Sequence, residues 1–257
     1  MIKSDDLSIF QKNQNLYENF VAKLIESAPV HGTFVDCGAH VGTHTKNMLR
    51  RSDINNVIAI EAIPDLANLL RNNYINESRL TIIQTAIGNN IGKSDFNVAE
   101  NSPGYSGIVK RDISDVTNWI KLSVPITKFD VLPEVTSSSS LINFIKLDLE
   151  GGELDALQGA KLTITKDRPF IVFENGLAKS ASIYNYSKLD FFNFFESIDY
   201  VVYDFFGNQV NELYWDIPLF TYMFVAFPSS SLLASWYYDN RKIILDSVIS
   251  DSQHINF

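Results

Sequence analysis

The sequence predicts an α/β protein with a doubly wound, Rossmann-like sheet of seven mostly parallel strands and helices on both faces. Three observations lead to this fold class. Short apolar runs alternate along the chain with segments of helical periodicity. Glycine, proline and asparagine residues separate these segments, and no internal repeat period is visible. Such alternation is typical of a parallel sheet covered by helices, which binds ligands beyond the carboxyl ends of its strands.

The expected strands are short runs rich in apolar and β-branched residues, bounded by turn residues. An acidic residue ends or follows several of them, as Glu61 and Glu174 do. In chain order the strands are expected at residues 33–37, 57–61, 80–87, 94–98, 141–149, 170–173, 200–206 and 219–227.

The expected helices are recognised by apolar residues three and four positions apart. The first carries an apolar stripe and ends at Pro29, and Pro64 opens another at a position where proline is favoured. Gly159 ends a short helix that buries Leu154 and Leu157. Apart from this short helix, the helices are expected at about residues 16–28, 41–51, 64–70 and 190–198.

The composition limits the class of protein. The chain has 257 residues, a net charge of −9 and a pI near 4.9. This charge opposes nucleic acid or an anionic membrane as a partner. The sequence shows neither an N-terminal apolar signal core nor an apolar stretch that could span a bilayer, so we expect a cytoplasmic protein. The single cysteine, Cys37, excludes an intramolecular disulfide and is expected to be a buried packing residue.

The most informative motif is a strand that ends around Asp36, followed by Gly38, Gly42 and a helix. The two glycines permit a tight turn and a close approach of the main chain to a ligand. A second apolar run ends in Glu61, an acid that would accept hydrogen bonds from a ribose diol. The motif therefore predicts a site for a nucleoside cofactor.

The same turn discriminates between cofactors. A dinucleotide fingerprint requires glycines at positions 38, 40 and 43, but His40 and Thr43 occupy two of these. Asp36 would repel a diphosphate, whereas it suits the cationic groups of S-adenosylmethionine. We therefore expect S-adenosylmethionine, with its amino-acid end on the turn, its ribose on Glu61 and its adenine near Ala86. The expected cofactor-binding residues are Asp36, Gly38, His40, Gly42, Thr43, Glu61, Ala62, Ala86 and Asp148.

Three motifs, in order, resemble those of the FkbM-type methyltransferases. They are the turn from Asp36 to Gly42, the segment 145–153 (IKLDLEGGE) with the LQGA that follows it, and the segment 168–174 (RPFIVFE). The resemblance covers about residues 33–176. It implies a class I S-adenosylmethionine-dependent fold and methyl transfer, usually to oxygen, with acceptors that include sugars, glycans and polyketide-like compounds. The chain departs from the family pattern at His40, where asparagine is common, and at Gly152, where an aromatic residue is common.

The resemblance also implies an organisation and an activity. We expect an N-terminal helical lead over residues 1–32, a methyltransferase domain over residues 33–230 and a helical C-terminal extension over residues 231–257. The expected activity is O-methylation of a sugar, nucleotide sugar or surface-glycan hydroxyl. The expected partner is a small-molecule or glycan acceptor. Nucleic acid and membrane insertion are not expected, and a homodimer is compatible with the sequence.

A hydroxyl acceptor must lose its proton on methylation, which requires a carboxylate or histidine base or a bound cation. Asp148 ends the strand expected beside the first one, so it should face the reactive end of the cofactor. Glu174 ends the next strand, and His44 lies at the start of a helix. The candidate catalytic residues are therefore Asp148, Glu174 and His44.

Two further sets of candidates concern metal and substrate. A resemblance to metal-dependent class I O-methyltransferases implies a magnesium site at Asp148, Glu174 and Asn175, whose oxygen ligands suit that ion. A direct hydrogen bond from Glu174 to the substrate is the alternative.

Residues 100–107 have loop composition, and such loops often bind substrates. The candidate substrate-binding residues are Tyr105, Ser106, Glu150 and Asn175.

Other hypotheses stay open at this point. His40 and Thr43 disfavour a nicotinamide oxidoreductase, and the acidic pI disfavours nucleic-acid methylation. A non-catalytic S-adenosylmethionine-binding module and an O-methyltransferase of a polyketide-like molecule are the alternatives to the expected function. His40 and His44 could belong to a zinc site, but no third ligand with suitable spacing is evident.

Overall fold

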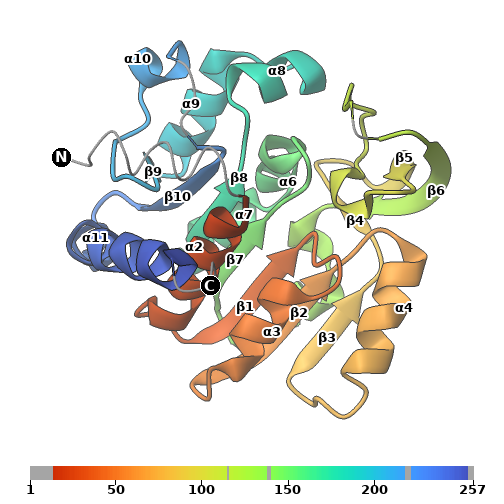
Figure 1. The fold of residues 1–257 in the computed structure, drawn as a ribbon, viewed down its shortest axis with the longest axis horizontal. Helices are drawn as coiled ribbons and strands as arrows, with labels where there is room; N and C mark the ends of the chain where they lie inside the picture. The colour runs from red at the N-terminus through yellow and green to blue at the C-terminus, as the bar shows by residue number, and fades with distance from the viewer. Residues whose placement is uncertain (1–13, 115, 138–139, 218–220, 254–257) are drawn as a thin grey trace.

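The computed structural model describes residues 14–114, 116–137, 140–217 and 221–253 (Figure 1). Residues 1–13 of the expected N-terminal helical lead, which spans residues 1–32, lie outside these residues. The strands are β1 (Gly32–Cys37), β2 (Ile54–Ile60), β3 (Leu80–Ile83), β4 (Ala86–Ile87), β5 (Gly92–Ala99), β6 (Trp119–Thr127), β7 (Ile142–Leu147), β8 (Phe170–Glu174), β9 (Tyr200–Asp204) and β10 (Met223–Pro228). The helices are α2 (Gln14–Ser27), α3 (Thr43–Arg50), α4 (Pro64–Asn73), η1 (Pro103–Tyr105), η2 (Phe129–Val131), α5 (Pro133–Thr136), α6 (Glu153–Gly159), α7 (Lys161–Asp167), α8 (Ala178–Tyr184), α9 (Lys188–Ser197), α10 (Glu212–Trp215) and α11 (Leu232–Gln253).

A seven-stranded sheet with the order β3-β2-β1-β7-β8-β10-β9 forms the centre of the molecule. Its neighbouring strands are parallel, except that β10 runs antiparallel to both β8 and β9. The strand order changes direction between β1 and β7, and the carboxyl ends at such a switch point border the crevice where α/β sheets bind ligands. The fold class predicted from the sequence is confirmed.

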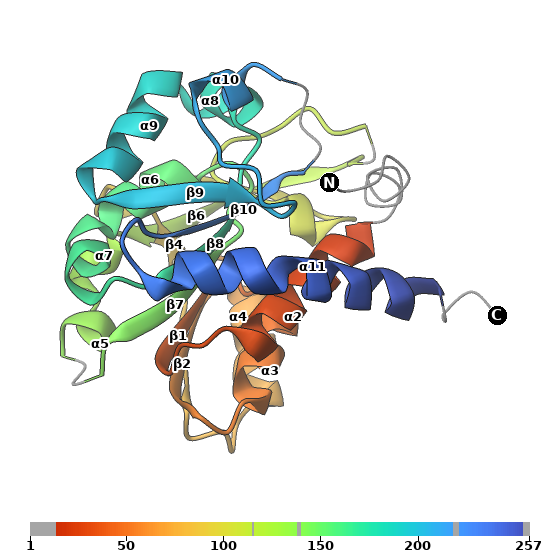
Figure 2. The same cartoon turned by 90° about the vertical axis from the view of Figure 1, so that its left-hand side faces the viewer.

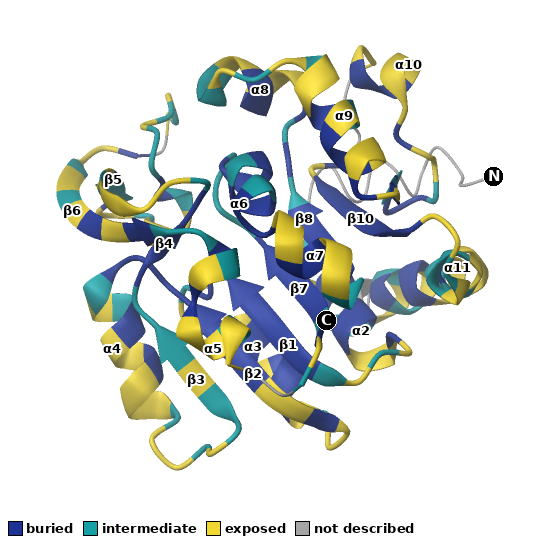
Figure 3. Cartoon of the chain, turned by 180° about the vertical axis from the view of Figure 1, so that it is seen from behind, coloured by how far each residue is buried: buried dark blue, intermediate teal, exposed yellow. Residues whose placement is uncertain are grey.

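Helices cover both faces of this sheet (Figures 1 and 2). Successive strand residues point to opposite faces, and because the central strands carry apolar residues at most positions, both faces must be covered. On one face, α2, α3 and α11 pack against Phe34 and Phe144. On the other face, α6, α7 and α9 pack against Val35 and Ile145. Figure 3 shows the central strands as buried. Burial on both faces explains why β7, β8 and β10 are nearly continuous apolar runs.

Helices from opposite ends of the described chain, α2 and α11, lie side by side on one face (Figure 2). Phe20 of α2 and Tyr237 of α11 are buried in the same core. This packing holds α2 against the sheet, so its first turns have a fixed place near the carboxyl edge. None of the described helices combines the length and the apolar character that a bilayer crossing requires.

A second sheet has three strands in the order β4-β6-β5. The sequence predicts one strand over residues 80–87, but the structure divides this segment between the two sheets. The break falls at Thr85, whose N–H donates to the Glu61 carbonyl at 3.1 Å and whose hydroxyl donates to the Pro125 carbonyl at 3.1 Å. Strand β6 was not predicted, because it carries exposed polar residues and a proline and buries little of its length.

Candidate active site

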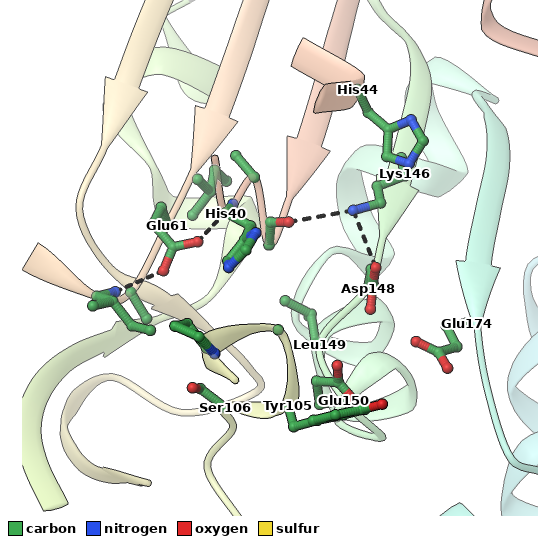
Figure 4. A pocket seen from close by; sticks show the side chains of 18 of the residues that line it. His40, His44, Glu61, Tyr105, Ser106, Lys146, Asp148, Leu149, Glu150 and Glu174 are labelled. Carbon is green, nitrogen blue, oxygen red and sulfur yellow. Dashed lines mark hydrogen bonds and ion pairs between the residues drawn. The ribbon is translucent and has the colours of Figure 1, made fainter. Parts of the chain in front are cut away.

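A cavity of about 1210 Å³ opens at the carboxyl edge of the main sheet. Gly38, Glu61, Asp148 and Glu174 end or follow β1, β2, β7 and β8 and line this cavity (Figure 4). The small sheet, the loop with η1 and the beginning of α2 complete its wall. The volume is sufficient for a nucleoside cofactor together with a small second molecule.

The turn after β1 depends on its glycines. Gly38 and Gly42 have φ angles of 76° and 88°, in the left-handed region that favours glycine. A Cβ atom on Gly38 would collide with the carbonyl oxygen of Asp148. Gly38 and Thr43 line the cavity, whereas Gly42 is the N-cap of α3, packs toward Leu70 and lies outside the cavity wall. Gly42 therefore shapes the turn but does not itself line the cavity.

Glu61 ties this turn to the end of β2 (Figure 4). Its Oε2 accepts a hydrogen bond from the N–H of His40 at 2.8 Å, and its Oε1 accepts one from the N–H of Ile63 at 2.7 Å. Burial raises the pKa of Glu61, and the two N–H donors oppose this shift. Glu61 lines the cavity together with Ala62 and Ala86. Because each carboxylate oxygen has a second lone pair, Glu61 can still accept hydrogen bonds from a ligand diol.

Lys146 of β7 is a buried cation that contacts two acids, and Figure 4 shows it beside one of them, Asp148. Its Nζ lies 3.4 Å from Oδ1 of Asp36 and 3.4 Å from Oδ2 of Asp148, and it donates to the Gly38 carbonyl at 3.2 Å. Burial alone would lower the pKa of Lys146, but the charges of Asp148 and Asp36 outweigh burial and raise it. Lys146 is therefore a fixed positive charge that connects the glycine turn to the end of β7.

The structure places Asp36 behind the cavity. Its side chain is fully buried and does not line the cavity wall. Its Oδ2 accepts a hydrogen bond from Oγ1 of Thr45 at 2.7 Å, while its Oδ1 faces Lys146. An acid within a central strand points into the covering helix layer and not over the sheet edge. The predicted contact between Asp36 and the cofactor is therefore not supported, and Asp36 supports Lys146 instead.

Three acidic side chains meet at the ends of β7 and β8. Carboxylate oxygens of Asp148, Glu150 and Glu174 lie within 4.8 Å of one another. Burial, followed by the charge of Asp148, raises the pKa of Glu174 well above its usual range. Burial also acts against ionisation of Asp148, but Lys146 and a hydrogen bond with Glu174 outweigh it and lower the pKa of Asp148. The pKa values of the two carboxyls are therefore shifted in opposite directions, and Asp148 is the member of the pair that favours the charged form.

Glu150 lines the cavity and forms an ion pair with Arg111. Burial, followed by the charge of Asp148, raises the pKa of Glu150 to about 8, although Arg111 opposes the shift. The guanidinium of Arg111 also lies 5.9 Å from the ring centre of Tyr105. Glu150 thus connects the end of β7 to the loop that follows η1.

Asn175 does not reach the cavity. It is 1% exposed, its Oδ1 accepts a hydrogen bond from the Leu177 N–H at 2.7 Å, and its Nδ2 donates to the Tyr186 hydroxyl at 3.1 Å. Consecutive residues at a strand end point in opposite directions, so Asn175 turns away where Glu174 turns in. The predicted substrate and metal roles of Asn175 are not supported by this position. Glu150 occupies the third place in the acidic cluster.

His44 lines the cavity at the first turn of α3 and is 4% exposed. Its Nε2 lies 2.8 Å from Oε2 of Glu18 in α2. A carboxylate at this distance favours the tautomer with the proton on Nε2. In the described part of the chain, Nδ1 of His44 is buried without a hydrogen-bond partner. The candidate base His44 is thus bound through Nε2 to the Glu18 carboxylate, on a helix that no sequence motif indicated.

Tyr105 and Ser106 line the cavity from the loop that contains η1 (Figure 4). Ser106 is 8% exposed, and its Oγ accepts a hydrogen bond from the N–H of Ala99 at 3.0 Å. Ser106 therefore fastens the loop to β5, and Tyr105 presents its ring at the cavity wall. The structure thus brings three of the four predicted substrate-binding residues, Tyr105, Ser106 and Glu150, to one side of the cavity.

Sequence reasoning missed several residues of the cavity wall. Glu18 on α2, Arg111 and Tyr222 line it but belong to no motif. Glu18 stands on the polar side of the apolar stripe of α2, where an acid is ordinarily solvated. No local pattern distinguishes such residues, because only the packing of distant elements brings them to the cavity.

Comparisons with known proteins place the chain among methyltransferases. The family model described as "Methyltransferase FkbM domain" matches residues 36–201. No curated protein matches the chain. The chain is similar to the solved structure of methyltransferase FkbM from Methylobacillus flagellatus KT, with 20% identity, a TM-score of 0.47 and coverage of 76% of this chain and 43% of that one. It thus spans less than half the length of that structure.

Other similar structures belong to enzymes with different described activities. One is the O-methyltransferase from Bacillus cereus in complex with SAH, with 14% identity, a TM-score of 0.45 and coverage of 89% of this chain and 92% of that one. Another is a putative RNA methyltransferase from Pyrococcus horikoshii, with 9% identity, a TM-score of 0.40 and coverage of 83% and 82%.

Proposed function

The chain belongs to the FkbM methyltransferase family, and from this premise we propose that it transfers a methyl group from S-adenosylmethionine to a hydroxyl oxygen of a sugar, nucleotide sugar or surface-glycan residue. The observation that carries the proposal is a single cavity that joins the glycine turn and Glu61 to Asp148 and Glu174. The first part suits a nucleoside without phosphates, and the second suits a hydroxyl that must lose a proton. Donor and acceptor would then meet in one partly enclosed space.

S-adenosylmethionine fits the part of the cavity beside the glycine turn. Glu61 would hold the two ribose hydroxyls, and the apolar surface of Ala86, Ile87 and Phe96 would hold the adenine. The amino-acid end would then lie near the turn at Gly38. This orientation directs the methyl group toward the ends of β7 and β8, where the acids lie.

The proton of the acceptor is the main chemical problem of the reaction. A bond forms between the acceptor oxygen and the methyl carbon, while the carbon–sulfur bond breaks and leaves its electron pair on sulfur. In our proposal the ionised Asp148 accepts the hydroxyl proton, and the protonated Glu174 holds the Asp148 carboxylate by a hydrogen bond. Lys146 stays protonated and fixes the position of Asp148.

The acidic cluster also fits a magnesium ion. Asp148, Glu150 and Glu174 offer carboxylate oxygens within 4.8 Å of one another, and carboxylates are suitable ligands for this ion. These three residues would hold the ion, which would lower the pKa of a bound hydroxyl. Magnesium is therefore part of the proposal as an optional cofactor, with Glu150 in place of Asn175.

The charge and shape of the cavity limit the range of acceptors in our proposal. The acids at the ends of β7 and β8 oppose a phosphate group, so the cavity favours a sugar or glycan hydroxyl over a nucleotide sugar. The ring of Tyr105 offers an apolar face for a sugar ring.

Mass spectrometry tests the proposal after the protein is incubated with S-adenosylmethionine and a panel of free sugars, glycans, nucleotide sugars and polyketide-like alcohols. Binding of S-adenosylhomocysteine without methylation of any acceptor would favour the non-catalytic module.

Removal of the Glu61 carboxylate tests the cofactor assignment. We expect Glu61→Ala to weaken S-adenosylhomocysteine binding by about 1.5–3 kcal/mol, because two ribose hydroxyls lose a charged acceptor. Isothermal calorimetry measures this change. Glu77→Ala is a control, because Glu77 pairs with Arg79 and does not line the cavity. An unchanged dissociation constant for Glu61→Ala would show that the ribose lies elsewhere.

Tyr105 tests the acceptor side independently of the cofactor. We expect Tyr105→Ala to raise the KM for the acceptor by an amount equivalent to about 0.5–1.5 kcal/mol, because an aromatic contact is lost. Tyr105→Phe keeps the ring and should stay close to wild type. Steady-state kinetics with a sugar that the wild-type enzyme methylates report on the acceptor site, and calorimetry with S-adenosylhomocysteine reports on the cofactor site. Unchanged acceptor kinetics in Tyr105→Ala would refute this role of the loop.

A further inference from the structure

Helix α2 brings an acid to the cavity that holds the glycine turn. Glu18 lines this cavity together with His40, Thr43 and His44, although it lies outside the segment 36–201 that matches the family. Its Oε2 pairs with Nε2 of His44 at 2.8 Å. The Glu18 side chain is nevertheless 52% exposed, so this pair does not seal its carboxylate from the cavity.

Glu18 is an anion at neutral pH. The hydrogen bond from His44 is the largest influence and lowers the pKa of Glu18; burial opposes it, and electrostatic attraction to His44 and then to Lys146 adds to it. Lys146 is already neutralised by Asp36 and Asp148, each 3.4 Å away. Negative charge therefore exceeds positive charge at this end of the cavity. A ligand that brings a cation would balance it.

His40 supplies a second and independent indication of a ligand. In the described part of the chain, its Nε2 is buried and has no hydrogen-bond partner. Burial, the largest influence, lowers the pKa of His40, so the ring is neutral at pH 7 and can donate one N–H. His40 lines the cavity, and its backbone N–H is already used by Glu61. An acceptor atom of a ligand would provide the missing partner of the ring.

We propose that Glu18 binds the α-ammonium group of S-adenosylmethionine and that Nε2–H of His40 donates to its α-carboxylate. The two groups lie at the glycine turn, where the amino-acid end of the cofactor belongs in the proposed function, on which this inference rests. Glu18 thereby takes the cation-binding role that the sequence assigns to Asp36, which is sealed behind Lys146. Helix α2 is then part of the cofactor site.

Calorimetry with two ligands tests the proposal without any acceptor. S-adenosylhomocysteine carries the ammonium and carboxylate groups, whereas 5′-methylthioadenosine has the same nucleoside and lacks the amino acid. Glu18→Gln keeps an oxygen that can accept from His44 but loses the charge. We expect it to weaken S-adenosylhomocysteine binding roughly tenfold to a hundredfold and to change 5′-methylthioadenosine binding less than twofold. His40→Phe should show the same selectivity with a smaller loss.

A matched control and distinct outcomes make the result decisive. Glu26→Gln makes the same charge change on α2 at a residue that pairs with Lys23 outside the cavity, and it should bind both ligands like wild type. Equal S-adenosylhomocysteine affinity in Glu18→Gln and wild type would overturn the proposal. An equal loss for both ligands would also overturn it, because that pattern indicates a structural role. If wild type bound 5′-methylthioadenosine and S-adenosylhomocysteine equally well, Glu18 would have no cofactor role. Failure of wild type to bind either ligand would instead remove the proposed cofactor itself.

Discussion

Asp148→Asn is expected to lower kcat for methyl transfer by roughly 10² to 10⁴. The amide has the same shape but cannot accept the acceptor's proton, as the ionised Asp148 does in the proposed mechanism. Affinity for S-adenosylhomocysteine should stay nearly unchanged, because the backbone at the end of β7 is preserved. Initial rates at saturating substrate give kcat, and calorimetry gives the cofactor affinity.

A remote acid serves as the control for this change. Asp95→Asn removes an exposed carboxylate of β5 that pairs with Lys121, and its kcat should match wild type. Full kcat in Asp148→Asn would remove Asp148 from the mechanism and make His44 the next candidate for the base.

The acidic pair also determines the pH profile. Because the pKa of Asp148 is lowered, wild-type kcat should fall on the acid side only below the usual carboxylate range, where Asp148 takes up a proton. Asp148→Asn should lack this acid limb of the pH profile.

Loss of activity with a chelator and its return with magnesium would support the metal-bound form of the site. Full activity after thorough chelation would leave the carboxylates alone as the proton acceptors.

The parts of the fold that the sequence predicts are those where one local pattern has one structural outcome. Buried parallel strands need apolar side chains on both faces, so β1, β2, β7 and β8 are visible as apolar runs. Adjacent parallel strands end at the same edge, so the meeting of Asp148 and Glu174 follows from the strand order. The turn at Gly38 is recognisable because its φ angle demands glycine.

Features that depend on side-chain direction or on distant packing could not be predicted. Asn175 is one residue beyond Glu174, and this single step turns it away from the cavity. Asp36 belongs to the predicted motif, but the direction of its side chain inside the sheet makes it a partner of Lys146.

Strand β6 pairs with β5 across a long loop and exposes one side, so it resembles a polar connection in the sequence. Glu18 reaches the cavity only because α11 and the sheet fix α2.

The second large effect concerns stability. Lys146 is 3% exposed and stands between Asp36, which is fully buried, and Asp148. Lys146→Met keeps most of the side-chain volume but leaves these carboxylates without their cation. Removal of one partner from a buried ion pair costs about 3–5 kcal/mol, because the charge left behind is neither hydrated nor compensated. We expect a loss of this size in the free energy of unfolding at neutral pH, measured by urea denaturation.

A second substitution identifies the origin of this loss. Asp36→Asn, combined with Lys146→Met, removes the buried negative charge that the lysine neutralised, while its amide oxygen can still accept from Thr45. The double variant should therefore be more stable than Lys146→Met alone, and a double-mutant cycle measures the coupling. Lys121→Met, at an exposed lysine that pairs with Asp95, should leave the unfolding free energy unchanged. If Lys146→Met unfolded like wild type, or if Asp36→Asn brought no recovery, the buried charges would not be coupled. Lys146 would then contribute to the site through its hydrogen bond to Gly38 and not through its charge.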